Sequence, residues 1–207
     1  MSEIELAPGR RPDRRVRRTQ EALRDALVGL ILEKGYEAIT VQDIADRADV
    51  GRSTFYAHFT DKDELLLRGL EELHNALDAA DGTIGPSLFA SARGLYAHAG
   101  DERRLYRAIF GRLGGGPLPL RVEGELFARV SGEFARLAPG ASPSTRAMAA
   151  RVTTSGFLGL LRMWLDEDEA ASSDAVADAF VALVLPGVAR SLGVPPERLL
   201  AVDGAHG

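Results

Sequence analysis

The chain has 207 residues, of which 45% are hydrophobic and 27% are charged, with a formal net charge of −5 at pH 7. A chain of this length can bury a real core in one or two compact domains. It contains no cysteine, which excludes disulfides, thiolate metal sites and cysteine nucleophiles. No apolar run approaches the ~20 residues of a transmembrane helix, and the N-terminus lacks the apolar core of a signal peptide. We therefore expect a cytoplasmic protein with no membrane partner.

The charge is unevenly distributed along the chain. Residues 1–60 hold ten basic and ten acidic side chains, whereas residues 61–207 hold fifteen basic and twenty acidic ones. The whole deficit of positive charge therefore lies in the second part. This asymmetry, rather than the net charge, indicates which part of the chain can meet an acidic partner.

Six arginines are concentrated between Arg10 and Arg18, opposed only by Asp13. Such a run can neutralise the phosphates of a nucleic acid or enter a narrow minor groove. We expect residues 1–13 to form a disordered leader, and a solvated tail explains its first two arginines equally well. Arg17 and Arg18 adjoin the first expected helix, so we expect them to contact phosphates.

The first helix is expected from about Arg14 or Thr19 to Lys34. Its apolar residues come in adjacent pairs that recur every four residues, as one buried helix face requires. These pairs are Ala22/Leu23, Ala26/Leu27 and Leu30/Ile31. Gly35 is the expected C-terminal stop.

A short second helix is expected after Thr40, which is a good N-cap. Asp43 follows three residues later, where its carboxylate can complete a capping box. One face of this helix is apolar, with Val41, Ile44, Ala45 and Ala48 at helical spacing. The run Asp49-Val50-Gly51 then breaks the pattern. We expect Gly51 to supply the backbone freedom of a tight turn.

A third short helix is expected from about Arg52 to His58. Phe55 and Phe59 are four residues apart and so share one face. The other faces carry side chains that can bond to phosphates or base edges, namely Arg52, Ser53, Thr54, Tyr56 and His58. Two short helices, a tight turn and a polar second helix predict a helix-turn-helix over residues 40–59.

A long fourth helix is expected from Asp61 to the Asp81-Gly82 break. Glu64 can complete a capping box at its start. Its apolar stripe consists of Leu66, Leu70, Leu73 and Leu77. A long helix that leaves a helix-turn-helix is a natural rigid lever to the rest of the chain.

The sequence VGRSTFYAHFTDKDEL (Val50 to Leu65), with residues 40–45 before it, resembles the DNA-binding domain of the TetR family of bacterial transcriptional regulators. The family pattern is an aromatic or aliphatic residue, then Tyr, a variable residue, His-Phe and, shortly after, a Lys that opens the next helix. Here these positions are Phe55, Tyr56, Ala57, His58, Phe59 and Lys62. The resemblance covers about Thr19 to Leu77. Gly51 replaces the usual Ser or Thr cap, and Ser53 stands where Gly or Ala is frequent, which bears on the operator sequence.

The resemblance implies a role for each matching side chain. Arg52 and Ser53 would read base edges in the major groove, with Thr54 supporting them. Phe55 and Phe59 would anchor the recognition helix to the first helix. Phosphates would be held by Thr40, Tyr56, His58 and Lys62. As an alternative, Tyr56, His58 and Lys62 are plain solvated surface residues.

The second half of the chain is also helical, with no alternating strand pattern of useful length. The expected helices span residues 86–99, 101–112, 120–137, 143–166 and 172–192. They are separated by Gly100, the Gly114–Pro117 run, Pro139-Gly140 and the acidic stretch Asp166–Glu169. The triple glycine lacks the Gly-Lys-Ser/Thr sequel of a phosphate-binding loop, so we interpret it as a flexible connection. Pro186 should kink the last helix, and residues 196–207 should be a mobile tail.

Small residues are concentrated in the segment 145–165, where they would let another helix approach closely. They are Ala147, Ala149, Ala150, Ser155, Gly156 and Gly159. With the apolar face formed by Val176, Phe180, Val184 and Val188, they could build the four-helix dimer seam that the family resemblance implies. The alternative is ordinary packing within one chain.

Family members enclose an effector pocket in this half of the chain. Aromatic side chains spread over several of the expected helices are the candidates for its lining: Phe89, Tyr96, Phe110, Phe127, Phe157 and Trp164. Phe134 and Met163 belong to the same scattered set. Aromatic residues at helical spacing also build plain cores, so each of them has that alternative.

The four histidines show no metal-ligand spacing, and no nucleophile motif appears. We expect no catalytic site, metal or cofactor. The expected protein is an all-α homodimer with a DNA-binding domain over residues 14–77 and an effector-binding and dimerisation domain over residues 78–195. It would be a repressor released from a palindromic double-stranded operator by a small hydrophobic effector. An architectural DNA-binding protein without effector and a transcriptional activator are the alternatives.

Overall fold

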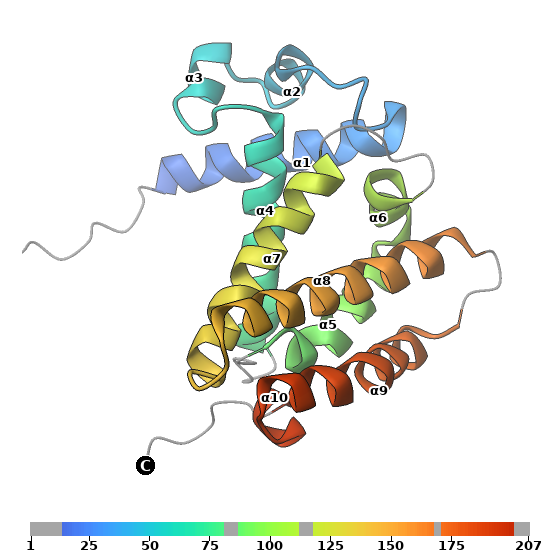
Figure 1. Cartoon of the computed structure of the whole chain (residues 1–207). Helices are drawn as coiled ribbons and strands as arrows, with labels where there is room; N and C mark the ends of the chain where they lie inside the picture. Colours follow the sequence, from blue (N-terminus) through green and yellow to red (C-terminus); the bar gives the residue numbers. More distant parts are fainter. Residues whose placement is uncertain (1–13, 81–86, 112–117, 168–170, 201–207) are drawn as a thin grey trace, which may run out of the picture.

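The computed structural model describes residues 14–80, 87–111, 118–167 and 171–200, without the side chains of residues 71 and 73–80. The described residues form helices and no strand, so the predicted all-α class is confirmed (Figure 1). The helices are α1 (Arg14–Lys34), α2 (Val41–Arg47), α3 (Arg52–Tyr56), α4 (Lys62–Ala80), α5 (Leu88–Asp101), α6 (Arg103–Phe110), α7 (Leu118–Leu137), α8 (Pro143–Asp166), α9 (Ser173–Leu192) and α10 (Pro196–Leu200). The expected leader, the triple glycine and the side chains of Leu73 and Leu77 lie outside the described residues.

The helices α1 to α3 lie together at one end of the molecule, and α4 runs from them toward the opposite end (Figure 1). The long helix α1 packs against α2, α4 and α6. Its buried residues are Leu23, Ala26, Leu27, Leu30 and Ile31, five members of the predicted apolar pairs. The positive φ of 75° at Gly35 ends this helix where the sequence predicts.

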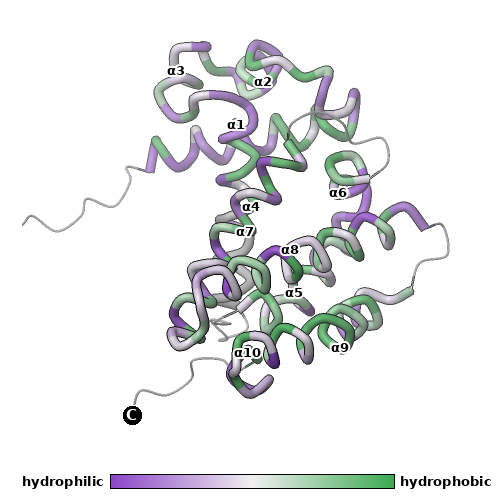
Figure 2. Tube along the Cα trace, in the orientation of Figure 1, coloured by the Kyte–Doolittle hydropathy of each residue, from purple (hydrophilic) through white to green (hydrophobic). Residues whose placement is uncertain are grey.

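The C-terminal helices form a second packed layer in which α8 lies between α7 and α9, and α5 packs on α9. A Cβ atom at Gly156 of α8 would lie 3.1 Å from Val184 Cγ2 of α9. The glycine therefore lets these two helices approach closely. Figure 2 shows that hydrophobic residues dominate the trace of α9.

An aromatic cluster fills the centre of this layer. The Phe180 ring on α9 stacks on Phe89 of α5 at 5.1 Å and meets the edge of Phe157 of α8 at 5.5 Å, between ring centroids. The Tyr96 hydroxyl donates a hydrogen bond to the Phe157 carbonyl oxygen at 2.9 Å. Burial with a satisfied hydroxyl makes Tyr96 a core residue that ties α5 to α8.

The side chain of Trp164 holds the end of α8 in place. Its Nε1–H donates to the Ala171 carbonyl oxygen at 2.6 Å, and the Arg103 guanidinium lies 4.8 Å from its ring centroid. A Cβ at Gly100 would lie 3.3 Å from the same ring. We predicted a break at Gly100, but α5 continues through it to Asp101. The glycine serves close helix packing there, not a turn.

The predicted mobile tail is wrong for residues 196–200. These residues form α10, in which Leu199 is fully buried and its carbonyl oxygen accepts a hydrogen bond from the Ser87 hydroxyl. The rest of that tail lies outside the described residues. Pro186 stands inside an uninterrupted α9, so the predicted kink does not break the helix.

The predicted dimer seam is only partly exposed. Val176, Phe180 and Val188 are buried within the chain, and Val184 contacts the core. For this face the alternative of packing within one chain is therefore correct. The apolar side chains that α8 and α9 expose are different ones, namely Met148, Val152, Met163 and Leu183.

Helix α9 is the one described helix that is long and apolar enough to span a membrane by length and composition. Its buried face contacts α5 and α8. A helix in the core of a folded domain can have the same length and apolar composition as a membrane helix, so these two properties of α9 do not indicate a membrane.

A buried carboxylate anchors the start of α5. Glu133 of α7 is 5% exposed, and its Oε2 accepts a hydrogen bond from the Leu88 N–H at 3.1 Å. Its Oε1 lies 3.4 Å from Arg129 Nε. Burial raises the pKa of the Glu133 carboxyl from 4.5 to about 7, although Arg129 and the Leu88 N–H act in the opposite direction.

We predict that Glu133 makes the protein less stable as the pH rises through this interval. The folded chain holds the proton more tightly than the unfolded one, so the stabilisation is complete below pH 4.5 and is lost as the pH rises to about 7. The loss should be on the order of 3 kcal/mol. Urea unfolding at several pH values measures it.

The Glu133→Gln variant should flatten this pH dependence because the amide oxygen still accepts from Leu88 but does not titrate. Glu125→Gln, at an exposed position of the same helix, is the matched control and should keep the wild-type slope. Parallel profiles for wild type and Glu133→Gln would contradict the prediction.

Candidate nucleic-acid interface

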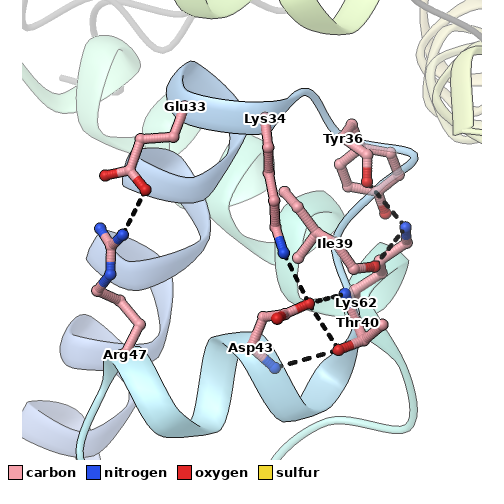
Figure 3. Close-up of polar contacts among 8 residues, drawn as sticks. All are labelled: Glu33, Lys34, Tyr36, Ile39, Thr40, Asp43, Arg47 and Lys62. Carbon is pink, nitrogen blue, oxygen red and sulfur yellow. Dashed lines mark hydrogen bonds and ion pairs between the residues drawn. The ribbon is translucent and has the colours of Figure 1, made fainter.

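Thr40 caps α2 through the predicted capping box (Figure 3). Its Oγ1 accepts from the Asp43 N–H at 3.1 Å, and Asp43 Oδ2 accepts from the Thr40 N–H at 2.7 Å and from its hydroxyl at 2.6 Å. Lys34 Nζ lies 2.9 Å from the same Oδ2. The Thr40 hydroxyl and N–H, followed by Lys34, hold the pKa of Asp43 well below its usual range. A charged Asp43 therefore fixes the start of α2.

Both hydrogen-bond donors of Thr40 point at Asp43 in this arrangement. A DNA phosphate would have to compete with that carboxylate for them. The phosphate contact of Thr40 stays a prediction. At the C-terminal end of α2, Arg47 forms an ion pair with Glu33 near the end of α1 (Figure 3). The pair is exposed, so its contribution to stability is small.

The turn between α2 and α3 uses a different residue from the one we predicted. Gly51 has an extended backbone with φ −73° and ψ 151°, and it is the N-cap of α3. The left-handed residue is Asp49, with φ 54°. Asp is among the few non-glycine residues that adopt this conformation readily, because its short polar side chain can bond locally.

Helix α3 turns one side to the core and the other to solvent. Phe55 is fully buried and Phe59 almost so, with their ring centroids 5.9 Å apart. The helix ends at Tyr56, two residues before the predicted end. Arg52, Ser53 and Tyr56 are exposed. This small helix therefore presents polar side chains from a rigid apolar base.

Arg52 and Tyr56 lie side by side on the exposed face of α3. Arg52 Nη2 is 3.3 Å from the Tyr56 hydroxyl oxygen, and the guanidinium carbon is 5.7 Å from the ring centroid. Thr54 and His58 are half-buried next to this face. The structure thus brings together five of the predicted DNA contacts, all within residues 52–58.

Lys62 occupies an unexpected position at the start of α4. Its Nζ donates to the carbonyl oxygens of Tyr36 and Ile39, each at 2.9 Å, and lies 4.4 Å from the centroid of the Tyr36 ring (Figure 3). These two bonds use two of the three ammonium hydrogens. Lys62 therefore joins α4 to the segment between α1 and α2, a role that the sequence analysis missed. Its predicted phosphate contact would have to use the remaining hydrogen.

Arg17 and Arg18 are exposed near the start of α1. Arg17 Nε lies 3.6 Å from Glu21 Oε1, one turn further along the helix. An exposed pair of this kind is weak enough for a phosphate to replace the carboxylate. The predicted contacts of both arginines remain untested.

Tyr36 and Asp63 are structural residues of the interface that sequence reasoning did not single out. Tyr36 is buried, and its hydroxyl donates to Asp63 Oδ1. Burial, followed by the hydrogen bond and charge of Asp63, raises the pKa of Tyr36, so its hydroxyl keeps its proton. An aromatic residue directly after the glycine that ends α1 was the signal available in the sequence.

A cavity of about 650 Å³ lies beside α4, between that helix and the helices α5 to α8. Its apolar lining comes from the five helices α4 to α8 and includes Leu70, Leu95, Tyr106, Phe110, Leu126, Phe157 and Leu161. Charged side chains also line it: Glu64, Arg68, Arg121, Glu125 and Arg129. The cavity thus combines an apolar lining with an ionic one.

Two of the six predicted pocket residues, Phe110 and Phe157, line this cavity. Phe89 lines a second cavity, between α5 and α9. Tyr96 and Trp164 belong to the core, and Phe127 lies 4.3 Å beneath the Arg151 guanidinium. Tyr106, which sequence reasoning did not propose, contributes a phenol whose pKa burial raises. Ligand contacts by any of these residues remain untested.

The geometry agrees with the comparison to known families. Residues 23–68 match the family of bacterial regulatory proteins called the tetR family. The chain thus contains a domain of the TetR family. Its members are transcriptional regulators and not enzymes, and the matched residues include α2, α3 and the buried pair Phe55 and Phe59.

Individual relatives match this chain over different lengths. It is 35% identical over 111 residues to the regulator TcmR of Streptomyces glaucescens, covering 54% of this chain and 45% of TcmR. The chain spans between 14% and 45% of the length of the curated relatives it matches.

Solved structures match over a larger share of the chain. A TetR transcriptional regulator from Streptococcus agalactiae is 26% identical with a TM-score of 0.58, over 83% of this chain and 96% of that one. RolR in complex with resorcinol is 21% identical with a TM-score of 0.52, over 87% and 97%, which shows a shared fold.

We predict that Lys62→Met destabilises the protein by about 1–3 kcal/mol, because it leaves the Ile39 carbonyl oxygen without its donor and removes one of the two donors to that of Tyr36. Urea unfolding of the full chain measures this. Arg47→Met is the matched control, since it also removes a basic side chain from the DNA-binding domain but breaks only an exposed ion pair. It should cost less than about 1 kcal/mol. Equal costs for the two variants would show that Lys62 is not a structural tie.

Proposed function

We propose that this protein is a sequence-specific DNA-binding transcriptional regulator, a cytoplasmic homodimer that represses from a palindromic operator until a small apolar effector releases it. One observation carries the proposal. The five-residue helix α3 exposes Arg52, Ser53 and Tyr56 while Phe55 is fully buried beneath them. A polar face on a rigid base is what base reading in the major groove requires.

The two alternative functions, an architectural DNA-binding protein and a transcriptional activator, predict different results on DNA. An architectural protein would bind through phosphates and deformability, with no defined palindromic site. An activator would occupy the same operator but raise transcription. Footprinting on genomic DNA separates the first alternative from the proposal, and reporter output after deletion of the gene separates the second.

Arg52→Ala should cost about 1–3 kcal/mol on the cognate operator and far less on random DNA, because Arg52 is placed to read a base edge. Fluorescence anisotropy titrations with both DNAs measure this difference. The cognate operator is first selected from random sequences with the wild-type protein. Arg47→Ala, which removes an exposed arginine from α2, is the control. Equal losses on both DNAs would mean that Arg52 holds a phosphate.

The homodimer is proposed from the exposed apolar stripe of α8 and α9. Met148, Val152 and Met163 are each more than half exposed and lie with Ser155 and Gly159 along one face of α8. Leu183 of α9 is 75% exposed. Large apolar side chains in contiguous patches mark interaction sites. A second copy is the fitting occupant, since a dimer places two recognition helices on half-sites ~34–36 Å apart.

Leu183→Glu should convert the dimer to a monomer, because it places a charge in a desolvated seam. Leu120→Glu is the matched control, since Leu120 on α7 is equally exposed at 73% and lies off this stripe. Light scattering after size exclusion gives the mass of each variant, and circular dichroism checks folding. A dimeric Leu183→Glu protein would remove α9 from the proposed seam.

The effector site is proposed to be the cavity beside α4. A volume of about 650 Å³ suits a small organic molecule. The cavity is lined from α4, which begins directly after the recognition motif, and from the four helices α5 to α8. A molecule that fills it can therefore act on α4, with a coupling of about 1–3 kcal/mol for a release of about 5–150-fold.

A further inference from the structure

One carboxylate connects the C-terminal layer to the end of the molecule formed by α1 to α3, which we call the DNA-reading end. Arg121 of α7 places its Nη1 2.7 Å from Asp63 Oδ2 and 3.4 Å from Asp61 Oδ2. The other oxygen of Asp63, Oδ1, accepts the hydrogen bond of the Tyr36 hydroxyl. Asp63 is only 13% exposed, so water screens these bonds less than those of a surface pair. We call Arg121, Asp63 and Tyr36 the interdomain latch.

The latch continues into the recognition motif through Lys62. The phenol of Tyr36 belongs to the latch, and Lys62 donates hydrogen bonds to the backbone carbonyl oxygens of Tyr36 and Ile39. Ile39 directly precedes Thr40, the N-cap of α2. A shift of Tyr36 therefore changes the entry to α2, which carries α3.

Arg121 is also a lining residue of the cavity beside α4, whereas Asp61 and Asp63 are not. The guanidinium is thus the member of the latch that a molecule in the cavity reaches. A guanidinium has only donors, so the group that draws it away must be an acceptor. To compete with a carboxylate partner, that acceptor needs a negative charge of its own.

The carboxylates that line the cavity do not oppose such a ligand equally. Both carboxylate oxygens of Glu64 already have partners. Its Oε2 accepts hydrogen bonds from the N–H and the hydroxyl of Thr60, both at 2.7 Å, and its Oε1 lies 3.4 Å from Arg68 Nη2. Glu125 is exposed. The apolar lining, with Leu70, Phe110 and Leu161 among its members, calls for a hydrophobic body.

We propose that the effector is an apolar molecule with a carboxylate or a similar anionic group, and that this group takes Arg121 from Asp63 and opens the interdomain latch. This proposal rests on the proposed function and assigns the ligand class and the route of its action. Loss of Arg121 leaves Asp63 with Tyr36 as its partner, so Asp63 and Tyr36 shift together and loosen the entry to α2. The affinity for the operator falls as a result.

The experiment uses the full-length protein with its selected operator and anisotropy as the readout. The probes are alkyl and aryl carboxylates, each paired with its primary amide and with the amine of the same hydrocarbon body. A carboxylate should lower operator affinity by about 5–150-fold, whereas its amide and amine should not. The carboxylate must bind more weakly by the same factor when operator is present, because the coupling is reciprocal.

Two variants locate the effect. Arg121→Gln should bind operator as weakly as the liganded wild type and should no longer respond to the carboxylate. Arg129→Gln removes another guanidinium from the cavity lining and should keep the response. Thermal unfolding of both variants checks that they fold.

The outcomes separate the two proposals. If the wild type selects no defined operator, the proposed function fails. If it binds an operator but amides or amines release it as well as carboxylates do, the ligand class is overturned. Release by carboxylates that persists in Arg121→Gln, or is lost only in Arg129→Gln, overturns the latch, and so does a failure of every probe to release the operator.

Discussion

The geometry of the DNA-reading end depends on one ammonium group. Lys62 Nζ binds the carbonyl oxygens of Tyr36 and Ile39 at 2.9 Å and lies over the Tyr36 ring. Within the segment between α1 and α2, the Ile39 N–H also donates to the Tyr36 carbonyl oxygen at 3.2 Å, and Lys62 from α4 supplies the donor for the Ile39 carbonyl oxygen. Because α4 also lines the proposed effector cavity, the same bond joins the position of the recognition motif to the rest of the chain.

A five-residue helix such as α3 is too short to be stable alone. Its position comes from Phe55 beneath it and from the capping box that fixes α2 before it. The exposed side of α3 is therefore free to carry polar residues that the stability of the domain does not require. This division explains why Arg52 and Tyr56 remain accessible on an otherwise well-packed domain.

The cavity beside α4 has both apolar and charged side chains in its lining. Apolar side chains from five helices line it, together with charged side chains from α4 and α7. Asp63 takes part in both halves of the molecule because one oxygen faces Tyr36 and the other faces Arg121. A part-buried carboxylate with two partners is costly to leave unpaired. Loss of its bond to Arg121 would therefore affect its bond to Tyr36 as well.

Local features were predictable because neighbouring residues decide them. The capping box of Thr40 and Asp43, the stop of α1 at Gly35 and the buried spacing of Phe55 and Phe59 all follow from the sequence. The family pattern over residues 50–65 added the DNA-binding role. The turn was less well predicted, since both Asp49 and Gly51 could adopt a positive φ and the sequence favoured the wrong one.

Contacts between distant segments were decided only by the tertiary structure. Composition marked Gly100 as a break and residues 196–200 as a mobile tail, but Trp164 packs on the glycine and Ser87 holds the carbonyl of Leu199. The bond from Arg121 to Asp63 spans 58 positions along the chain. Periodicity and capping act within a few residues, so the sequence by itself determined the helices and the recognition motif. Which side chains meet across helices, and hence where a ligand can act, depends on packing that no local pattern encodes.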